Sequence, residues 1–337
     1  MLARFLKNDL ALALCGDAVW LSRNPREEPV RMPAYVAVHA TTRKVLAAGE
    51  EARAMWRNEP ANIAVLRLLD TQSGGNDVDA WSEFLRYFLR KTARQTSIFP
   101  PRIVCVAEAR MRSFLKPVVL AAGARAVMFL EPRMAAAIGC GLAVEEPAPK
   151  SILVLDRHTV SFGVIALAGL VADFVMEQGV SRLLDDIVLH VLATRRVALD
   201  VERLHGEILK RGLTGTDAIG WESWLTEIGT GRLTATSVDE SDLRRLTLPF
   251  QHLLAWNHRR AFETVPLEKR VAAEAVSTVL VGPYARLPGF RELVAAALLR
   301  PVAVAEAPEA CLVRGGAEVL KDLSFLLSYV TSPKSKR

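Results

Sequence analysis

The chain contains 337 residues, of which 51% are hydrophobic and 24% are charged, and its net charge is +6. Because a single hydrophobic core stops growing at roughly 250–300 residues, this length predicts two cores. The composition excludes a disordered or fibrous protein, and no apolar run reaches the ~20 residues of a membrane span. No secretory signal is recognisable. The positive charge comes without a zinc finger, recognition helix or RNP-type strand, so we expect anionic lipid rather than nucleic acid as a partner.

The four cysteines are Cys15, Cys105, Cys140 and Cys311. They are far apart, form no CxxC pair and join no Cys/His cluster with zinc spacing, so the sequence predicts no metal site. Three of them lie in apolar stretches. We interpret the cysteines as small buried side chains in a reducing compartment.

The first half begins with an apolar side of a short predicted helix, formed by Met1, Leu2, Phe5 and Leu6. Apolar segments separated by polar turns then predict strands of an antiparallel or mixed sheet. These segments are residues 10–14, 19–22, 34–40 and 44–50.

From Ala80 the apolar spacing changes to the period of an amphipathic helix. The positions that carry this period are Trp81, Phe84, Leu85 and Phe88. Residues 102–107 and 127–132 predict buried strands, and residues 132–142 predict a helix with proline near its start.

A proline-rich hinge at 145–150 precedes the second half, which starts with a predicted hairpin at 151–156 and 162–169. Two amphipathic helices follow. Their apolar positions are Leu183, Leu184, Ile187, Val188, Val191 and Leu192 in the first and Val201, Leu204 and Ile208 in the second. A strand at 277–282, helices at 289–299 and 312–323, and a basic tail complete the chain.

Each half therefore opens with a hairpin and then alternates strand and helix. This duplication predicts a two-lobed α/β protein of the actin and sugar-kinase type, although the pattern alone assigns no function. We predict lobe I at 1–150, with a small subdomain at about 31–67 and a C-terminal helix, 316–330, returning to it. Lobe II is predicted at 151–315, with a small subdomain at about 182–255, and the tail at 331–337.

Several long segments resemble the MreB family of bacterial actins. They are VLAAGEEARAMWRNEPANIAVLRLL at 45–69, AAGARAVMFLEPRMAAAIGCGLAVEEP at 121–147, and RLPGFRELV with VAEAPEACLVRGGAEVL near the C-terminus. The second is similar to the family's AGA…EEPMAAAIG.GLPVEEP. The first residues, MLARFLKNDLALAL, resemble the start of Gram-negative members. The likeness spans nearly the whole chain.

The resemblance implies an actin-like fold, shared with sugar kinases and the DnaK ATPase, with four subdomains around a central cleft. It implies a cytoplasmic protein, peripheral on the inner face of the cytoplasmic membrane, that forms double filaments with itself or with a standard MreB. Partners would be anionic lipid and membrane proteins of wall elongation. ATP with Mg²⁺ would lie between the lobes, on two phosphate hairpins and a Gly-rich turn.

The first phosphate hairpin of the family, DLGTANT, corresponds to ALCGDAV here. Ala13 replaces the strand aspartate, and Cys15 replaces the loop glycine. Gly16 and Asp17 rescue the turn if the register slips by one residue. The alternative is that Asp17 is a plain turn residue.

The second hairpin, DIGGGTTEVAVI in the family, corresponds to DRHTVSFGVI. Asp156 remains, where the resemblance implies contact with Mg²⁺ through water. Arg157, His158 and Thr159 replace the three glycines, and their side chains would crowd a polyphosphate that needs bare backbone N–H groups. Arg157 is either a charged clamp for an anion or a solvated loop residue. His158 has no second metal ligand near it.

The Gly-rich turn, TGGGALLRG in the family, corresponds to VGPYARLPG. Gly282 and Gly289 remain. Pro283 removes an N–H donor, and Tyr284 either stacks on a base or packs in the core.

The helix VERLHGEIL places Glu207 at the family's ribose-contacting glutamate and His205 at a lysine. Gly179 keeps its place in a strand-to-helix turn, where Val180 or Ser181 replaces an aspartate. In the segment of the family's water-positioning glutamate, the nearby carboxylate is Glu108, which comes too early in the chain. We therefore assign no catalytic residue.

Each lost phosphate contact costs ~1–3 kcal/mol, and the summed loss exceeds the ~8 kcal/mol of a micromolar ligand. We predict weak or absent ATP binding and negligible ATPase activity. The degenerate nucleotide pocket would consist of Gly16, Asp156, Gly179, His205, Glu207 and Gly282.

The resemblance also implies that the N-terminal helix is an amphipathic membrane anchor, and a frayed terminus with chance hydrophobics is the alternative. For the whole protein, four interpretations remain. They are a filament subunit or partner without an ATP cycle, a conventional ATP-dependent MreB, a small-molecule kinase of the same superfold, and a non-filamentous adaptor resembling FtsA or PilM. The kinase lacks its hairpins and catalytic carboxylate, and the segment around 45–56 favours MreB over FtsA.

Overall fold

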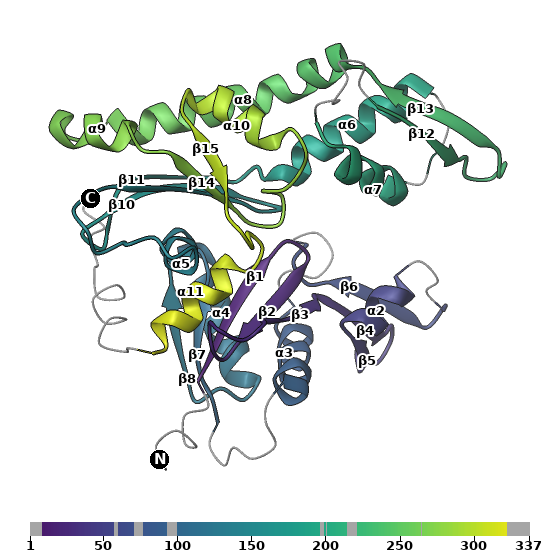
Figure 1. Cartoon of the computed structure of the whole chain (residues 1–337). Helices are drawn as coiled ribbons and strands as arrows, with labels where there is room; N and C mark the ends of the chain where they lie inside the picture. The colour runs from purple at the N-terminus through teal and green to yellow at the C-terminus, as the bar shows by residue number, and fades with distance from the viewer. Residues whose placement is uncertain are drawn as a thin grey trace. The chain divides into compact units, whose positions relative to one another are not determined.

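The computed structural model describes residues 9–56, 60–70, 77–92, 100–195, 199, 201–213, 221–263 and 265–321. The chain divides into two compact units (Figure 1). Unit 1 consists of Met1–Leu142 and Ala310–Arg337, and unit 2 consists of Ala143–Glu309. The chain therefore passes from unit 1 to unit 2 and back once. The predicted N-terminal helix and the 331–337 tail lie outside the described residues.

The five-stranded sheet of unit 1 has the order β3-β2-β1-β7-β8. Its strands are β1 (Leu10–Cys15), β2 (Ala18–Ser22), β3 (Val30–Pro33), β7 (Arg102–Val106) and β8 (Ala126–Leu130). The first three strands pair antiparallel, whereas β1, β7 and β8 pair parallel. Strands β1 and β7 are continuously apolar because helices cover both faces of the sheet.

Four α-helices of unit 1 pack on this sheet and beside it. They are α3 (Val78–Thr92), α4 (Arg112–Ala121), α5 (Pro132–Gly139) and α11 (Cys311–Val319). A short 3-10 helix, η1 (Ala109–Met111), precedes α4. The predicted α3 positions are all buried, with Trp81, Phe84 and Phe88 fully enclosed. They share a core with Leu10, Leu12 and other residues of one sheet face.

A separate three-stranded sheet in unit 1 has the order β5-β4-β6. It contains β4 (Tyr35–His39), β5 (Val45–Ala48) and β6 (Ile63–Arg67), and α2 (Glu50–Met55) packs on it. Small alanine side chains on both layers let the helix approach closely.

The main sheet of unit 2 repeats the topology of unit 1, with the order β11-β10-β9-β14-β15. Its strands are β9 (Lys150–Leu155), β10 (Val160–Ala166), β11 (Gly169–Met176), β14 (Thr278–Val281) and β15 (Val302–Val304). Again two hairpins pair antiparallel, and the remaining strands run parallel to the first. The duplication predicted from the sequence is confirmed at the level of strand order.

The helices of unit 2 surround a single core of mainly leucine, valine and phenylalanine. They are α6 (Val180–Arg195), α7 (Val201–Arg211), α8 (Glu240–Glu263), α9 (Leu267–Glu274) and α10 (Phe290–Leu298). A two-stranded sheet of β12 (Trp221–Thr226) and β13 (Leu233–Val238) completes the unit. The sequence patterns predicted α6, α7 and α10 but missed α8, which has Pro249 inside it.

Helices α5 and α11 of unit 1 lie side by side with their backbones in contact (Figure 1). A Cβ atom built on Gly139 would lie 1.9 Å from the carbonyl oxygen of Cys311, and one on Gly315 would lie 1.8 Å from that of Ala135. Only glycine fits at either position, because a Cβ cannot approach a backbone oxygen so closely. The two helices therefore pack with their backbones in direct contact.

His258 on α8 lies among aromatic rings of the unit 2 core. Its ring centroid is 5.1 Å from that of Phe162 and 4.8 Å from that of Phe262. Burial, and secondarily the charge of Arg300, lowers the pKa of His258 to about 4. The native state therefore keeps this imidazole neutral at pH values at which the unfolded chain protonates it.

We expect this mismatch to destabilise unit 2 as the pH falls. Above an unfolded pKa of 6.5 the effect is zero. The destabilisation grows as the pH drops towards 4 and then levels off. The total loss in the free energy of unfolding is about 3 kcal/mol. Urea unfolding between pH 7 and pH 4 should show a weaker pH dependence in His258→Leu than in the native chain. Identical pH dependences would contradict the assignment.

Candidate nucleotide site

The second hairpin of the predicted site joins β9 to β10 in unit 2. The N–H of Asp156 donates to the carbonyl of Thr159 at 3.0 Å, which closes a loop that contains Arg157 and His158. All four side chains are partly exposed. The loop thus carries two long side chains where the related family has bare glycine backbone.

The start of α6 holds this hairpin from its carbonyl side. The N–H of Val180 donates to the carbonyl of Asp156 at 3.1 Å, and the N–H of Ser181 donates to that of Arg157 at 3.0 Å. The Ser181 hydroxyl donates to the same Arg157 oxygen at 2.7 Å. These N–H groups at the helix start, which in other proteins bind phosphate, are satisfied by the hairpin.

Gly179 is the residue that permits this contact. A Cβ atom at Gly179 would lie 2.2 Å from the carbonyl oxygen of Arg157 and 2.5 Å from the carbonyl carbon of His158. It lies in the turn between β11 and α6, the strand-to-helix turn in which the sequence placed it. Its observed role is backbone packing between α6 and the hairpin.

Gly282 lies at the same edge of the unit 2 sheet. It follows β14, as Asp156 follows the parallel neighbour β9. Its φ is +98°, and a Cβ atom there would lie 2.3 Å from the carbonyl oxygen of Leu155. The Gly282 N–H donates to the carbonyl of Pro308 at 2.8 Å. The structure therefore brings Asp156, Gly179 and Gly282 together at the carboxyl ends of parallel strands, where α/β proteins bind ligands.

The turn after Gly282 is occupied by protein side chains. Tyr284 packs against the unit 2 core. Pro283 lacks an N–H, and the N–H of Ala285 donates back to the Gly282 carbonyl at 3.2 Å. These backbone hydrogen bonds hold the turn in place.

The two predicted residues of α7 lie beside oppositely chargeable side chains of unit 2. His205 Nε2 lies 3.2 Å from Asp185 Oδ1 on α6. Glu207 pairs with Lys210 at 3.2 Å and with Arg211 at 3.5 Å on its own helix. Glu207 therefore already has charged partners with which a ribose hydroxyl would have to compete.

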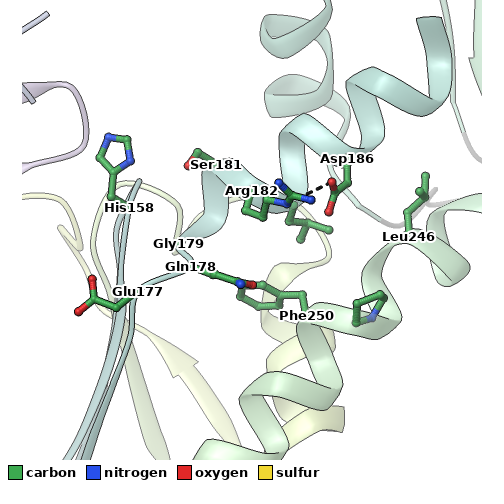
Figure 2. A pocket seen from close by; sticks show the side chains of 11 residues that line it. His158, Glu177, Gln178, Gly179, Ser181, Arg182, Asp186, Leu246 and Phe250 are labelled. Carbon is green, nitrogen blue, oxygen red and sulfur yellow. Dashed lines mark ion pairs between the residues drawn. The ribbon is translucent and has the colours of Figure 1, made fainter. Parts of the chain in front are cut away.

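A cavity of about 490 Å³ lies beside the hairpin (Figure 2). Figure 2 shows the Arg182–Asp186 ion pair, 3.3 Å long, on one side and His158 with Glu177 on the other. Leu183, Leu246, Pro249 and Phe250 add an apolar wall, and Gln178 and Ser181 complete the lining with Gly179. Of the six predicted pocket residues, only Gly179 lines this cavity.

The first hairpin, in unit 1, is a two-residue turn between β1 and β2. Gly16 has φ +69° and Asp17 does not have a positive φ, as a type II′ turn requires. Asp17 Oδ1 pairs with Arg31 at 2.7 Å, and the Asp17 carbonyl accepts from Ala34 at 2.8 Å. Asp17 is therefore engaged with β3 and its end, which fits its interpretation as a turn residue.

A buried charge cluster at the ends of β7 and β8 was missed by the sequence analysis. The Arg133 side chain is 6% exposed; it pairs with Glu131 and lies 3.6 Å from Glu108. Arg112 pairs with Glu131 at 2.9 Å. A buried guanidinium requires such carboxylate partners. The available signal was an arginine inside the otherwise apolar run PRMAAAIG.

Comparisons with known proteins match most of the chain to MreB and Mbl proteins. A family model described as MreB/Mbl protein matches residues 28–327. The cell shape-determining protein MreB of Escherichia coli K12 is 28% identical over 95% of this chain and 96% of its own length. The cell shape-determining protein Mbl of Bacillus cereus is 25% identical over 87% of this chain and 90% of its own.

Solved structures show the same fold. MreB5 of Spiroplasma citri superposes with a TM-score of 0.79 at 16% identity, covering 96% of this chain and 99% of that chain. The MamK double helical filament gives a TM-score of 0.74 at 14% identity, covering 94% and 99%. This likeness confirms the predicted actin-like α/β fold.

Within the described ranges, no helix is both long and apolar enough to span a bilayer. The duplicated sheets, the actin-like neighbours and a family model that covers most of the chain agree with one another. This protein belongs to the MreB/Mbl family of cell shape-determining, actin-like cytoskeletal proteins.

Proposed function

We propose that this chain assembles into actin-like filaments, alone or with a standard MreB, on the inner face of the cytoplasmic membrane, and that it does so with weak or absent ATP binding. A filament role is supported by kinship to shape-determining proteins and by the likeness to MamK, whose structure is a double helical filament. Organising wall synthesis, together with membrane proteins of wall elongation, is part of the same proposal.

The observation that carries the impaired ATP cycle is the hairpin from Asp156 to Thr159. Phosphate oxygens need N–H groups that they can approach without side chains in the way. Here Arg157 and His158 occupy those positions, and the start of α6 uses two of its N–H groups to hold the hairpin carbonyls. The proposed pocket of Gly16, Asp156, Gly179, His205, Glu207 and Gly282 would be a remnant.

The conventional alternative is an ATP-dependent MreB filament. MreB5 of Spiroplasma citri was solved with AMPPNP and with ADP, so a protein of this fold can hold nucleotide. Electron microscopy with and without Mg·ATP separates the two possibilities. Filaments of equal length and number in both samples support the proposal. Filaments that require ATP favour the conventional alternative. An adaptor is favoured if no sample contains filaments of this chain, including a sample to which a standard MreB has been added.

Membrane association is tested at the N-terminus, where Met1, Leu2, Phe5 and Leu6 form the proposed apolar side of an anchor. Burying one phenylalanine side chain contributes ~1.5–3 kcal/mol, or roughly 10–150-fold in affinity. We expect Phe5→Glu to reduce co-sedimentation with anionic vesicles by at least about tenfold.

The matched control is Ala3→Glu, which changes the net charge equally but lies off the apolar side of the predicted helix. This variant should retain most of the vesicle binding. Equal losses in both variants would indicate that charge alone, without an inserted apolar face, governs the binding.

A further inference from the structure

Two cysteines that are far apart in the sequence meet in unit 1. Cys140 is the C-cap of α5, and Cys311 is the first residue of α11. Their Sγ atoms lie 3.2 Å apart, although 171 residues separate them along the chain. Both are thiols in this structure. The other two cysteines are buried in strands β1 and β7.

The close packing of α5 and α11 at their glycines brings the two cysteines together. Gly139 precedes Cys140, and the space for its missing Cβ atom is filled by the carbonyl oxygen of Cys311. The backbones that carry the two thiols are therefore in van der Waals contact. Because the Sγ atoms are already adjacent, small side-chain rotations bring them to the ~2.05 Å of a disulfide.

The position of the pair in the chain gives the contact a further meaning. The chain leaves unit 1 at Leu142, shortly after Cys140, and returns at Ala310, immediately before Cys311. A covalent bond here would tie together the two points at which unit 1 connects to unit 2. It would also close a loop that contains the whole of unit 2.

We propose that Cys140 and Cys311 form a reversible dithiol–disulfide site whose oxidant is a small disulfide such as oxidised glutathione. The half-buried Cys140 is the accessible thiol, whereas Cys311 is buried. The Cys140 thiolate attacks one sulfur of oxidised glutathione and releases one glutathione. The Cys311 thiolate then attacks Cys140 Sγ and displaces the second glutathione. The protein loses two electrons and two protons, and the oxidant becomes two glutathione thiols.

The environment of the pair sets the rate of this reaction. The hydrogen bond with the Cys311 thiol and, secondarily, burial raise the pKa of Cys140 above its ordinary value. Because only the thiolate attacks a disulfide, oxidation should be slow at neutral pH and accelerate about tenfold per pH unit between pH 7 and 9.

The test uses the full chain with its native cysteines. After incubation with oxidised glutathione, the intact mass should fall by about 2 Da, since two hydrogens are lost. Non-reducing trypsin digestion should yield one linked pair, residues 134–150 joined to residues 292–314, because Arg300 precedes proline and is not cleaved. Dithiothreitol should restore the original mass.

Single-cysteine variants identify the order of attack. Cys311→Ala should stop at a stable adduct of one glutathione on Cys140, and Cys140→Ser should show little reaction. The matched controls, Cys15→Ala and Cys105→Ala, should oxidise like the native chain; burial also raises the pKa of Cys105 to about 12. No mass loss in the native chain, or a linked peptide that contains Cys15 or Cys105, would overturn the proposal. Both of these outcomes are measured on the native chain, so the test stands even if a variant fails to fold.

Discussion

The native chain should show no saturable binding of Mg·ATP below a Kd of about 1 mM, which corresponds to ~4 kcal/mol of binding free energy. A micromolar ligand has ~8 kcal/mol of binding free energy, and losing four nucleotide contacts at ~1–3 kcal/mol each removes ~4 kcal/mol or more, at least half of it. The relevant losses are the glycines replaced by Arg157, His158 and Thr159, and the donor missing at Pro283. Isothermal titration measures the Kd of Mg·ATP, and a phosphate-release assay measures the rate of ATP hydrolysis.

A restored hairpin makes the steric reason testable. The double variant Arg157→Gly with His158→Gly removes both side chains from the loop and leaves the contacts of α6 with the hairpin carbonyls in place. We expect at least about a tenfold gain in ATP affinity over the native chain, equivalent to ~1.4 kcal/mol. Unchanged circular dichroism verifies that the fold is intact.

The opposite result also has a defined meaning. If Arg157 clamps an anion, Arg157→Ala weakens ATP binding further and the double variant gains nothing. Low-micromolar binding by the native chain, with ordinary turnover, would show that the hairpin accommodates phosphate despite its side chains. The family membership would be unaffected by either outcome.

The second large effect is expected from Gly315→Ala at the crossing of α5 and α11. The new Cβ would lie 1.8 Å from the carbonyl oxygen of Ala135. Its nearest neighbours are backbone atoms of Ala135, which cannot rotate out of the way as a side chain can. Relief requires the helices to separate, which costs overpacking energy and exposes neighbouring apolar side chains. We expect a loss of about 3 kcal/mol or more in the stability of unit 1.

Gly206→Ala is the matched control, because Gly206 also lies within a helix but has open space where a Cβ would stand. Replacing it should stabilise α7 by ~0.5–1 kcal/mol. Hydrogen exchange of peptides covering 132–142 and 311–319 reports on unit 1 separately from unit 2. Equal protection of these peptides in Gly315→Ala and the native chain would refute the packing argument.

Periodicity and apolar runs predicted most of the elements whose buried side chains follow a regular spacing or a continuous run. The i, i+3, i+4, i+7 spacing around Trp81 and Phe84 predicted α3, and the runs at 102–107 and 151–156 predicted β7 and β9. The repeated succession of a hairpin followed by alternating strands and helices was predicted from the same patterns, whereas the strand order came from the structure. These predictions succeed because burial of one face or both faces leaves a direct trace in the sequence.

Helix α8 was missed for a physical reason. Its 24 residues contain an internal proline and many polar side chains, so neither propensity nor a clean apolar stripe marks it. Tertiary packing of Leu243, Phe250 and Leu254 holds it in place. Such stabilisation depends on partners that are distant in the sequence.

The candidate site was only partly predictable. The resemblance to the family placed Asp156, Gly179 and Gly282 in one pocket, and the structure shows Asp156 and Gly282 at the ends of the neighbouring parallel strands β9 and β14. The buried pair of Arg133 and Glu108 was not foreseen, because Arg133 lies in the first turn of α5 and Glu108 follows β7, far away in the sequence. The arginine within an apolar run indicates a buried charge, but only the fold identifies its partner.

The hydrogen bonds between α6 and the Asp156–Thr159 hairpin affect which substitutions such a protein can accept during evolution. The loop is held by hydrogen bonds from α6 to its own carbonyls and by the close approach of Gly179. Its outward side chains can therefore be exchanged during evolution without unravelling the scaffold. A filament subunit can in this way lose residues that bind nucleotide and still keep the fold that adjacent subunits contact.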